Sequence, residues 1–297
     1  MNQKTKRHIL ATIVVDGQVD AVAPTFTISA LSGASNVLAM QIVASEVVTG
    51  FAVGDITITA GGSLASFATS DNKTFTVSWT LAAGANTMDI AAGVCVDAAG
   101  NENIAATQYN AGFLTIQPDS TADIDDVIKS GDSSPYPLAT SLWLGLNGGF
   151  VRRLLIRPSL TDIPTFATIS SAVFTLAMEG ESSTSARRLS LYKQKRDWIV
   201  TQASWNKYTS ANNWQTAGGF GADDCEQTEF AGINLSATEA NGAKAITLPA
   251  TTKAALGAYG WLVMLSDETA DSYLFITCNH PTPSQRPKLV IVYYVNP

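Results

Sequence analysis

Apolar and polar residues alternate in short runs along most of the chain. Alternation with a period of two places one side of each run in a core, which is typical of β-strands. In the N-terminal part the pattern predicts strands at 24–30, 37–45, 55–60, 73–80, 87–91 and 113–116. Short strands at this spacing are typical of a β-sandwich of about 100 residues.

Turn-forming residues separate these runs. Thr49-Gly50, Gly61-Gly62, Asp71-Asn72 and the Ala-Gly-Asn sequence at 99–101 combine Gly and Asn, which accept positive φ, with Asp, which caps its own turn. The polar segment 117–123 is a longer break, and we place a domain boundary there.

Alternation resumes after this break. The clearest hairpin joins 141–146 to 150–157, and Asn147-Gly148 is expected to supply the two positive φ angles of a type I′ turn. Further strands are predicted at 172–178, 188–193, 261–266, 274–277 and 288–294, and a short helix only at 251–259. The chain is therefore expected to be all-β, with one domain at 21–117, a second at 118–297, and 1–20 as an N-terminal arm or a first strand.

Length and composition support two domains. The 297 residues are 46% apolar, which suffices for two cores, and only 14% are charged, against about 25% in an average soluble protein. The net charge is −7 and the basic residues are scattered except for Lys4, Lys6 and Arg7, so nucleic acid is not an expected partner.

The N-terminus has only part of a signal-peptide pattern. The apolar run at 9–15 ends at Asp16 without a small-residue cleavage site, so we do not expect a signal peptide. This run can instead add a strand to another chain's sheet, or form the first strand of the first domain. No run of about 18 apolar residues occurs, and no membrane span is expected.

Cysteine and histidine are scarce. Cys95, Cys225 and Cys278 form neither a disulfide framework nor a C-x-x-C zinc pair, which indicates a reducing compartment. With His8 and His280 as the only histidines, most His-dependent catalysis and most zinc sites lack their usual residues.

Candidate catalytic groups are also few. Glu179 with Glu181, or Asp223 with Glu226, could be the paired carboxylates of a glycan-cleaving enzyme. Closely spaced acids in a loop are more often simply solvated, and the motifs G-x-S-x-G and H-E-x-x-H do not occur. We therefore expect no enzymatic activity.

Four motifs follow one another in the first domain: Ser-Glu-Val-Val-Thr-Gly-Phe at 45–51, Val-Gly-Asp-Ile at 53–56, Asp-Asn-Lys-Thr-Phe at 71–75 and Val-Asp-Ala-Ala-Gly-Asn at 96–101. In order and spacing they resemble the bacterial Ig-like repeat of large adhesins and phage surface proteins, which implies an Ig-like β-sandwich at 21–117. The family usually opens with an Asp just before a Pro-Thr pair, whereas Asp20 here lies four residues ahead of Pro24.

A second series of motifs lies at 152–157 (Arg-Arg-Leu-Leu-Ile-Arg), 163–164, 167–172, 197–198, 204–206, 214–219 (Trp-Gln-Thr-Ala-Gly-Gly) and 286–290 (Arg-Pro-Lys-Leu-Val). It resembles the DNRLRE-type domain, which implies a β-jelly-roll sandwich related to carbohydrate-binding modules. Pro158-Ser159 replaces the family's usual Phe-Asp, and the letters that name the family are not recognisable at 123–130.

A glycan-binding module stacks sugar rings on Trp or Tyr and binds hydroxyls with Asn, Asp or Arg. The candidate residues here are Trp205, Asn206, Tyr208, Asn212, Asn213 and Trp214. In the competing interpretation Trp198 and Trp205 belong to the core. Tyr136 and Trp143 can add a second platform, unless the strand tryptophan is also core.

Structural calcium is the one expected cofactor, because calcium prefers carboxylate, Asn and carbonyl oxygens. Asp97, Asn101 and Asn103, with Glu46 or Asp55, are one candidate set, although Asp97 and Asn101 can also simply cap a turn. The second candidate set is Asp123, Asp223 and Asp224.

Together these features predict a non-catalytic virion surface protein of the capsid decoration, head-fibre or tail-adhesin type. The N-terminal region would contact capsid or tail subunits, and the C-terminal domain would contact host-surface polysaccharide. A homo-oligomer is compatible with this hypothesis. The alternative is a secreted or cell-surface bacterial protein that binds polysaccharide.

Overall fold

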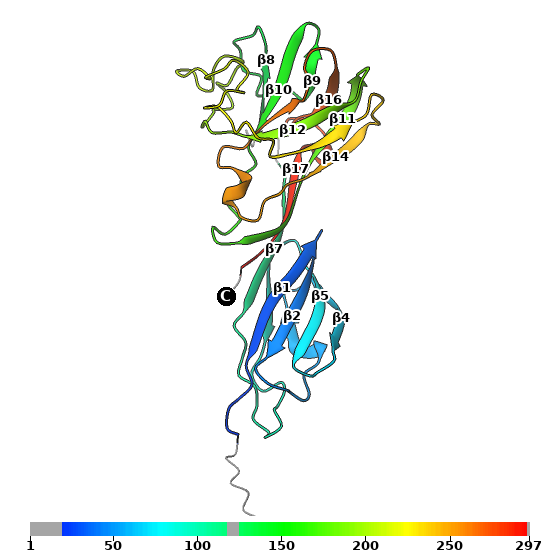
Figure 1. Cartoon of the computed structure of the whole chain (residues 1–297), viewed down its shortest axis with the longest axis vertical. Helices are drawn as coiled ribbons and strands as arrows, with labels where there is room; N and C mark the ends of the chain where they lie inside the picture. The colour runs from blue at the N-terminus through cyan, green and yellow to red at the C-terminus, as the bar shows by residue number, and fades with distance from the viewer. Residues whose placement is uncertain (1–19, 118–124, 296–297) are drawn as a thin grey trace, which may run out of the picture.

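The computed structural model describes residues 20–117 and 125–295. In these ranges the regular elements are seventeen strands and three 3-10 turns, with no α-helix, so the all-β prediction is confirmed. The strands form a small N-terminal sheet and a large curled antiparallel sheet (Figure 1). No helix in this described part is long and apolar enough to cross a membrane.

The N-terminal body is a sandwich. One sheet has the order β1 (Phe26–Ala34), β2 (Val37–Ala44), β5 (Thr74–Thr80) and β4 (Ser63–Thr69). The other layer consists of β3 (Ile56–Ile58), β6 (Gly84–Ile90) and β7 (Tyr109–Ile116). Strand β2 buries Leu38, Met40 and Ile42, which shows how the period of two builds this core.

The C-terminal body is one large curled sheet. Its strands are β8 (Asp125–Lys129), β9 (Ser141–Asn147), β10 (Phe150–Ile156), β11 (Thr168–Ser182), β12 (Arg187–Lys193), β13 (Ala231–Leu235), β14 (Gly242–Thr247), β15 (Trp261–Leu265), β16 (Ser272–Ile276) and β17 (Lys288–Val295). The path of this sheet is β13-β12-β15-β10-β9-β16-β11-β17-β7-β6-β3, with β14 on β11 and β8 on β10. The sheet curls around an apolar core that includes Phe174, Trp261 and Phe275.

A second, smaller core lies on the other side of β10 and β15. There Leu155 and Leu262 from the strands meet Trp198 and Trp214 from the long segment 194–230. Successive residues of β10 therefore serve different cores, since Leu154 and Ile156 belong to the main one. This arrangement explains the run Leu-Leu-Ile at 154–156, which does not alternate.

The two bodies share one sheet. Strand β17 pairs antiparallel with β7, from Leu289 opposite Ile116 to Val295 opposite Asn110. Ile291 lies in the C-terminal core, whereas its neighbour Val292 lies in the N-terminal core. The segment 118–123 therefore separates the two bodies along the chain, while hydrogen bonds across β7 and β17 join them in space.

Two further contacts support this junction. Gln117 Nε2 donates hydrogen bonds to the carbonyl oxygens of Pro283 (2.8 Å) and Arg286 (3.0 Å). At the end of β1, a Cβ on Gly33 would lie 2.3 Å from Ser170 Oγ on β11, so only glycine fits there without displacement.

The structure corrects several local predictions. Strands β4, β8, β13 and β14 lie where no strand was predicted, because their short runs contain too many Ser, Ala, Gly and Asp residues for a clear alternation. The helix predicted at 251–259 is only the 3-10 turn η2 (Ala254–Leu256), which ends at Gly257 with φ of 93°. The hairpin turn uses Gly148 and Gly149, with φ of 60° and 82°, rather than Asn147-Gly148.

Candidate functional sites

Three carboxyl groups converge where the described chain begins. Asp20 precedes β1, Glu46 follows β2, and Asp97 lies in a turn after β6. One oxygen from each lies within 4.8 Å of the others. The segment between Asp20 and β1 brings this first carboxylate close to two loops that are distant in sequence.

Asp97 is the buried member of this cluster. Its carboxylate accepts hydrogen bonds from the backbone N–H groups of Ala99 (2.8 Å) and Asn101 (2.9 Å) and from Asn101 Nδ2 (2.8 Å). These bonds, first that from the Asn101 side chain, lower the pKa of Asp97. Asn101 Nδ2 also donates to the carbonyl oxygen of Asp20 (2.9 Å).

The charges of the cluster act most clearly on Glu46. Partial burial, and then the charges of Asp20 and Asp97, raise its pKa, while Lys73 opposes the shift. The donor set fits Ca²⁺, because carboxylate oxygens dominate it and each carboxylate has about four lone-pair sites. A divalent cation would relieve the repulsion that Glu46 experiences.

The structure brings together part of the first predicted calcium set. Glu46 and Asp97 are neighbours, and Asn101 Nδ2 donates to Asp97, while calcium binding by these residues stays a prediction. Asp55 lies elsewhere and caps a turn by accepting the Ala52 N–H (2.8 Å). Asn103 is buried and accepts the Val94 N–H (2.9 Å), so its oxygen stabilises the loop.

Asp20 is the residue that sequence reasoning missed. Its distance from Pro24 departs from the family pattern, yet Asp20 still reaches Glu46 and Asp97. The family's opening Asp was the signal that could have identified this residue. The register of a short extended segment cannot be read from spacing alone, since each residue adds about 3.3 Å of reach.

The second predicted calcium set has a different role. Asp224 is fully buried, and its oxygens accept the backbone N–H groups of Gln215 (2.8 Å), Thr216 (2.9 Å) and Gly221 (3.2 Å). Asp224 therefore anchors the loop 215–224 in place of the metal-binding role predicted for it. Asp223 is exposed and accepts Gln215 Nε2 (3.0 Å), and Asp123 lies outside the described residues.

The predicted glycan-binding cluster is divided between core and surface. Trp214 is 5% exposed, and its Nε1 donates to the carbonyl oxygen of Ser204 (2.9 Å). Its ring packs against Tyr208 (5.4 Å between centroids) and below Gly219. This burial corrects the expectation that Trp214 presents its ring to a sugar.

Trp205 is half-buried and held from two sides. The Arg153 guanidinium lies 5.1 Å from its ring centre, and a Cβ on Gly218 would lie 2.8 Å from Trp205 Cη2. Arg153 also forms an ion pair with Glu268 (2.7 Å) and donates to Gly218 O (2.8 Å). These contacts give Trp205 a packing role and restrict the part of its ring that a ligand can reach.

The polar members of the predicted cluster are accessible. Asn206, Asn212 and Asn213 are exposed, and Tyr208 is half-buried. Asn212 Nδ2 donates to Thr209 Oγ1 (2.9 Å), which holds this loop in a tight turn. The exposed members of the predicted cluster therefore lie on one asparagine-rich loop, beside the half-buried Tyr208.

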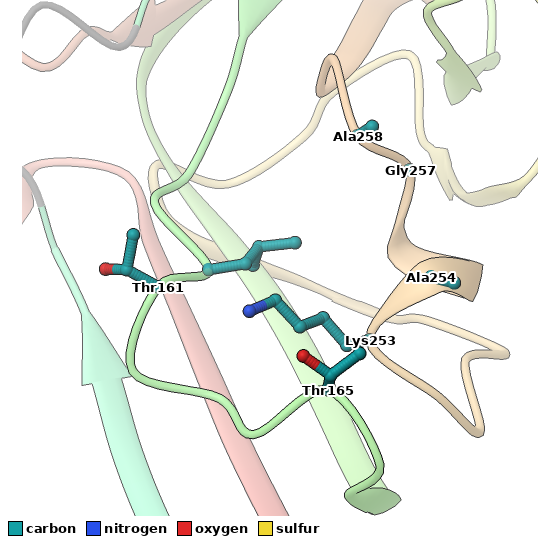
Figure 2. A pocket seen from close by; sticks show the side chains of 7 residues that line it. Thr161, Thr165, Lys253, Ala254, Gly257 and Ala258 are labelled. Carbon is teal, nitrogen blue, oxygen red and sulfur yellow. The ribbon is translucent and has the colours of Figure 1, made fainter.

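A separate hollow of about 410 Å³ lies between the loop 160–165 and η2 (Figure 2). Its lining residues are Leu160, Thr161, Thr165, Lys253, Ala254, Gly257 and Ala258. The Lys253 side chain crosses toward the loop, where its Nζ donates to the carbonyl oxygen of Ile163 (2.8 Å). Lys253 thus connects two loops, and the hollow is mainly apolar.

Comparison with known proteins agrees with this geometry for the N-terminal body. Residues 20–112 match the bacterial Ig-like domain family, which confirms the resemblance predicted for 21–117. The region that follows is β-rich and of unassigned family, so its likeness to DNRLRE-type domains stays a prediction. No curated protein matches the sequence.

Proposed function

We propose that the chain is a non-catalytic attachment protein of a virion surface, of the decoration, head-fibre or tail-adhesin type. The observation that supports this proposal is the sheet shared by β7 and β17. A continuous backbone ladder resists bending at the junction more strongly than a linker does, so one end of the molecule can hold the other at a distance.

The positions of the two ends agree with such a role. The blue start of the described chain lies toward one end of the elongated molecule, and the yellow-green loops of segment 194–230 lie toward the other (Figure 1). Under the proposal, the N-terminal region contacts capsid or tail subunits. The distal loops, with Asn206, Tyr208, Asn212 and Asn213, contact host polysaccharide.

Calcium has a structural role in this proposal. Asp20, Glu46 and Asp97 lie where the Ig-like body meets the N-terminal segment. A cation bound there would join residue 20 to the loops that follow β2 and β6. This would make the attachment at the N-terminal end more rigid.

Glycan binding is tested by placing the full-length protein on a glycan and bacterial-surface array. We expect binding that weakens in the double variant Asn206→Ala and Asn213→Ala, since both side chains are exposed and their loss leaves the core intact. Absence of binding to every glycan would overturn this part of the proposal, and shortening of a bound polysaccharide would overturn its non-catalytic part.

A bacterial cell-surface adhesion protein is the second candidate, because the matched family is described as bacterial. Mass spectrometry of purified virions and of cell envelopes from the source distinguishes the two. Recovery in virions supports the first proposal, and recovery in envelopes alone supports the second. Light scattering of the purified protein determines whether it is a homo-oligomer in either setting.

A further inference from the structure

A small pocket of about 170 Å³ is lined by β8, β9 and β10 and by the segment that joins β8 to β9. Its lining includes Lys129, Tyr136, Ser141, Trp143 and Arg152. These three strands lie at the end of the molecule away from the blue start of the described chain (Figure 1). The pocket therefore opens in the part of the protein that the proposed function assigns to host contact.

Two cations face this pocket from neighbouring strands. Lys129 on β8 lies directly opposite Arg152 on β10 in the antiparallel register, and both side chains line the pocket. Like charges at directly opposite positions destabilise a sheet. A guanidinium and an ammonium on adjacent strands can together bind one anion, which would offset their repulsion.

The protein itself neutralises only one of these charges. Lys129 Nζ lies 3.6 Å from Asp132 Oδ2, and the Tyr136 hydroxyl donates to the same carboxylate. Arg152 donates through Nη1 to the carbonyl oxygen of Asn147 (2.7 Å). Among the described residues, no carboxylate forms an ion pair with Arg152, so the pocket retains a net positive charge.

Aromatic rings complete the site. Tyr136 and Trp143 are both half-buried and border the same space as the two cations, together with the Ser141 hydroxyl. An aromatic ring packs against the C–H side of a sugar, while a guanidinium and an ammonium bind an anionic substituent. One sugar residue that carries an acidic group presents both of these features.

We infer that this pocket binds an anionic sugar residue, with Arg152 and Lys129 on its acidic group and Tyr136 and Trp143 beside its ring. The inference rests on the proposed glycan-binding function and names its ligand class. It also places the charged contact in the β8–β10 pocket rather than in the 206–213 loop.

The test uses the full-length protein on an array of uronic-acid, sialic-acid, phosphorylated and neutral oligosaccharides. Each carboxylated glycan that binds is then titrated by calorimetry beside the same glycan with its carboxyl group reduced to an alcohol. We expect reduction to weaken binding about tenfold or more, since a charge-assisted hydrogen bond contributes that much. A phosphorylated glycan that binds is compared in the same way with its dephosphorylated form.

Two variants locate the contact. Arg152→Gln and Lys129→Gln are each expected to weaken binding of the acidic glycan about tenfold, with circular dichroism verifying the fold. Lys195→Gln is the matched control, because Lys195 is exposed, lies outside both the pocket and the 206–213 loop, and donates from its Nζ to the carbonyl oxygen of Ala222 (2.8 Å). Its affinity for the acidic glycan is expected to stay unchanged.

The outcomes separate this inference from the proposed function. Equal binding of the acidic and neutral forms, or unchanged affinity in both Arg152→Gln and Lys129→Gln, overturns the inference and leaves glycan binding in place. Absence of binding to every glycan on the array overturns both the inference and the proposed glycan binding. Loss of affinity in Arg152→Gln and Lys129→Gln alone supports the pocket.

Discussion

The ring of Tyr293 on β17 lies over Gly112, its direct partner on β7. A Cβ built on Gly112 would lie 2.2 Å from Tyr293 Cε1, so the side chain of one body occupies the space that glycine leaves open in the other. An aromatic ring that covers a glycine on the neighbouring strand is a known means of fixing sheet register. This pair thus fixes the pairing that joins the two bodies.

Replacement of this glycine tests the junction. We expect Gly112→Ala to lower the free energy of unfolding by about 1–3 kcal/mol, because the added methyl overpacks a buried site. Urea denaturation measures the loss. Gly54→Ala is the control, since a Cβ there meets nothing within 4 Å, and it should change stability by less than about 0.5 kcal/mol. Equal stability of both variants would show that Tyr293 does not restrict residue 112.

Because Trp214 is buried, we expect its replacement to lower the stability of the fold and not only to weaken ligand binding. Trp214→Ala should destabilise the C-terminal body by about 3–5 kcal/mol, since it removes a core ring and leaves the carbonyl oxygen of Ser204 without its donor. Chemical denaturation followed by tryptophan fluorescence measures this effect. Asn213→Ala is the exposed control in the same loop, and it should retain the stability of the original protein.

The acidic cluster predicts stabilisation by calcium. Calcium should raise the melting temperature of the protein, and Glu46→Gln should reduce this rise. Folding raises the pKa of Glu46 above its ordinary value of 4.5, so the folded state favours the protonated carboxyl. The stability that Glu46 adds to the folded state is therefore present below pH 4.5 and is lost as the pH rises through the raised pKa. In a chelator at neutral pH, Glu46→Gln should therefore melt slightly higher than the original protein. An equal calcium response in both proteins would argue against this site.

The hydrogen bonds that Asp71 accepts predict that the β4–β5 turn loses stability in acid. Its carboxylate accepts the backbone N–H groups of Thr74 (2.7 Å) and Lys73 (3.0 Å), and these bonds lower the pKa of Asp71 to about 2. The stability contributed by this charge is present above the ordinary value of 3.8 and is lost as the pH falls toward 2.

Comparison with Asp71→Ala therefore has a defined pH profile. The variant should melt at a lower temperature than the original protein at pH 7, and the two melting temperatures should converge toward pH 2. Asp71→Asn retains an acceptor oxygen without the charge, so its melting temperature at neutral pH should lie between those of the original protein and Asp71→Ala. A difference that does not depend on pH would mean that the charge of Asp71 is not involved.

Features that depend on neighbouring residues were predicted from the sequence more closely than features that depend on pairing between distant strands. The strand at 37–45 was predicted to within one residue, because its alternation follows directly from one buried side. The hairpin at 141–157 was also predicted, although its turn lies one residue later. Strands β4 and β13 were not predicted, because their polar and small residues derive their β conformation from pairing with β5 and β12.

The candidate sites were harder to predict than the fold. Asp97 and Asn101 were recognised because one turn contains both. Trp214 was expected at the surface because polar residues flank it, yet a long loop can fold back and bury a ring against a sheet. Asp20 and the pair of Lys129 with Arg152 depend on contacts between distant segments, and sequence spacing carries little information about them.

The sequence by itself determined the all-β class, the Ig-like N-terminal body and most strand positions, since side-chain alternation and turn residues act over only a few neighbours. Tertiary structure alone decided that β7 and β17 form one sheet, that Trp214 is core, and that Lys129 and Arg152 share a pocket. Those features arise from packing between residues that are far apart along the chain. Their energies depend on the whole arrangement of the sheet rather than on any local pattern.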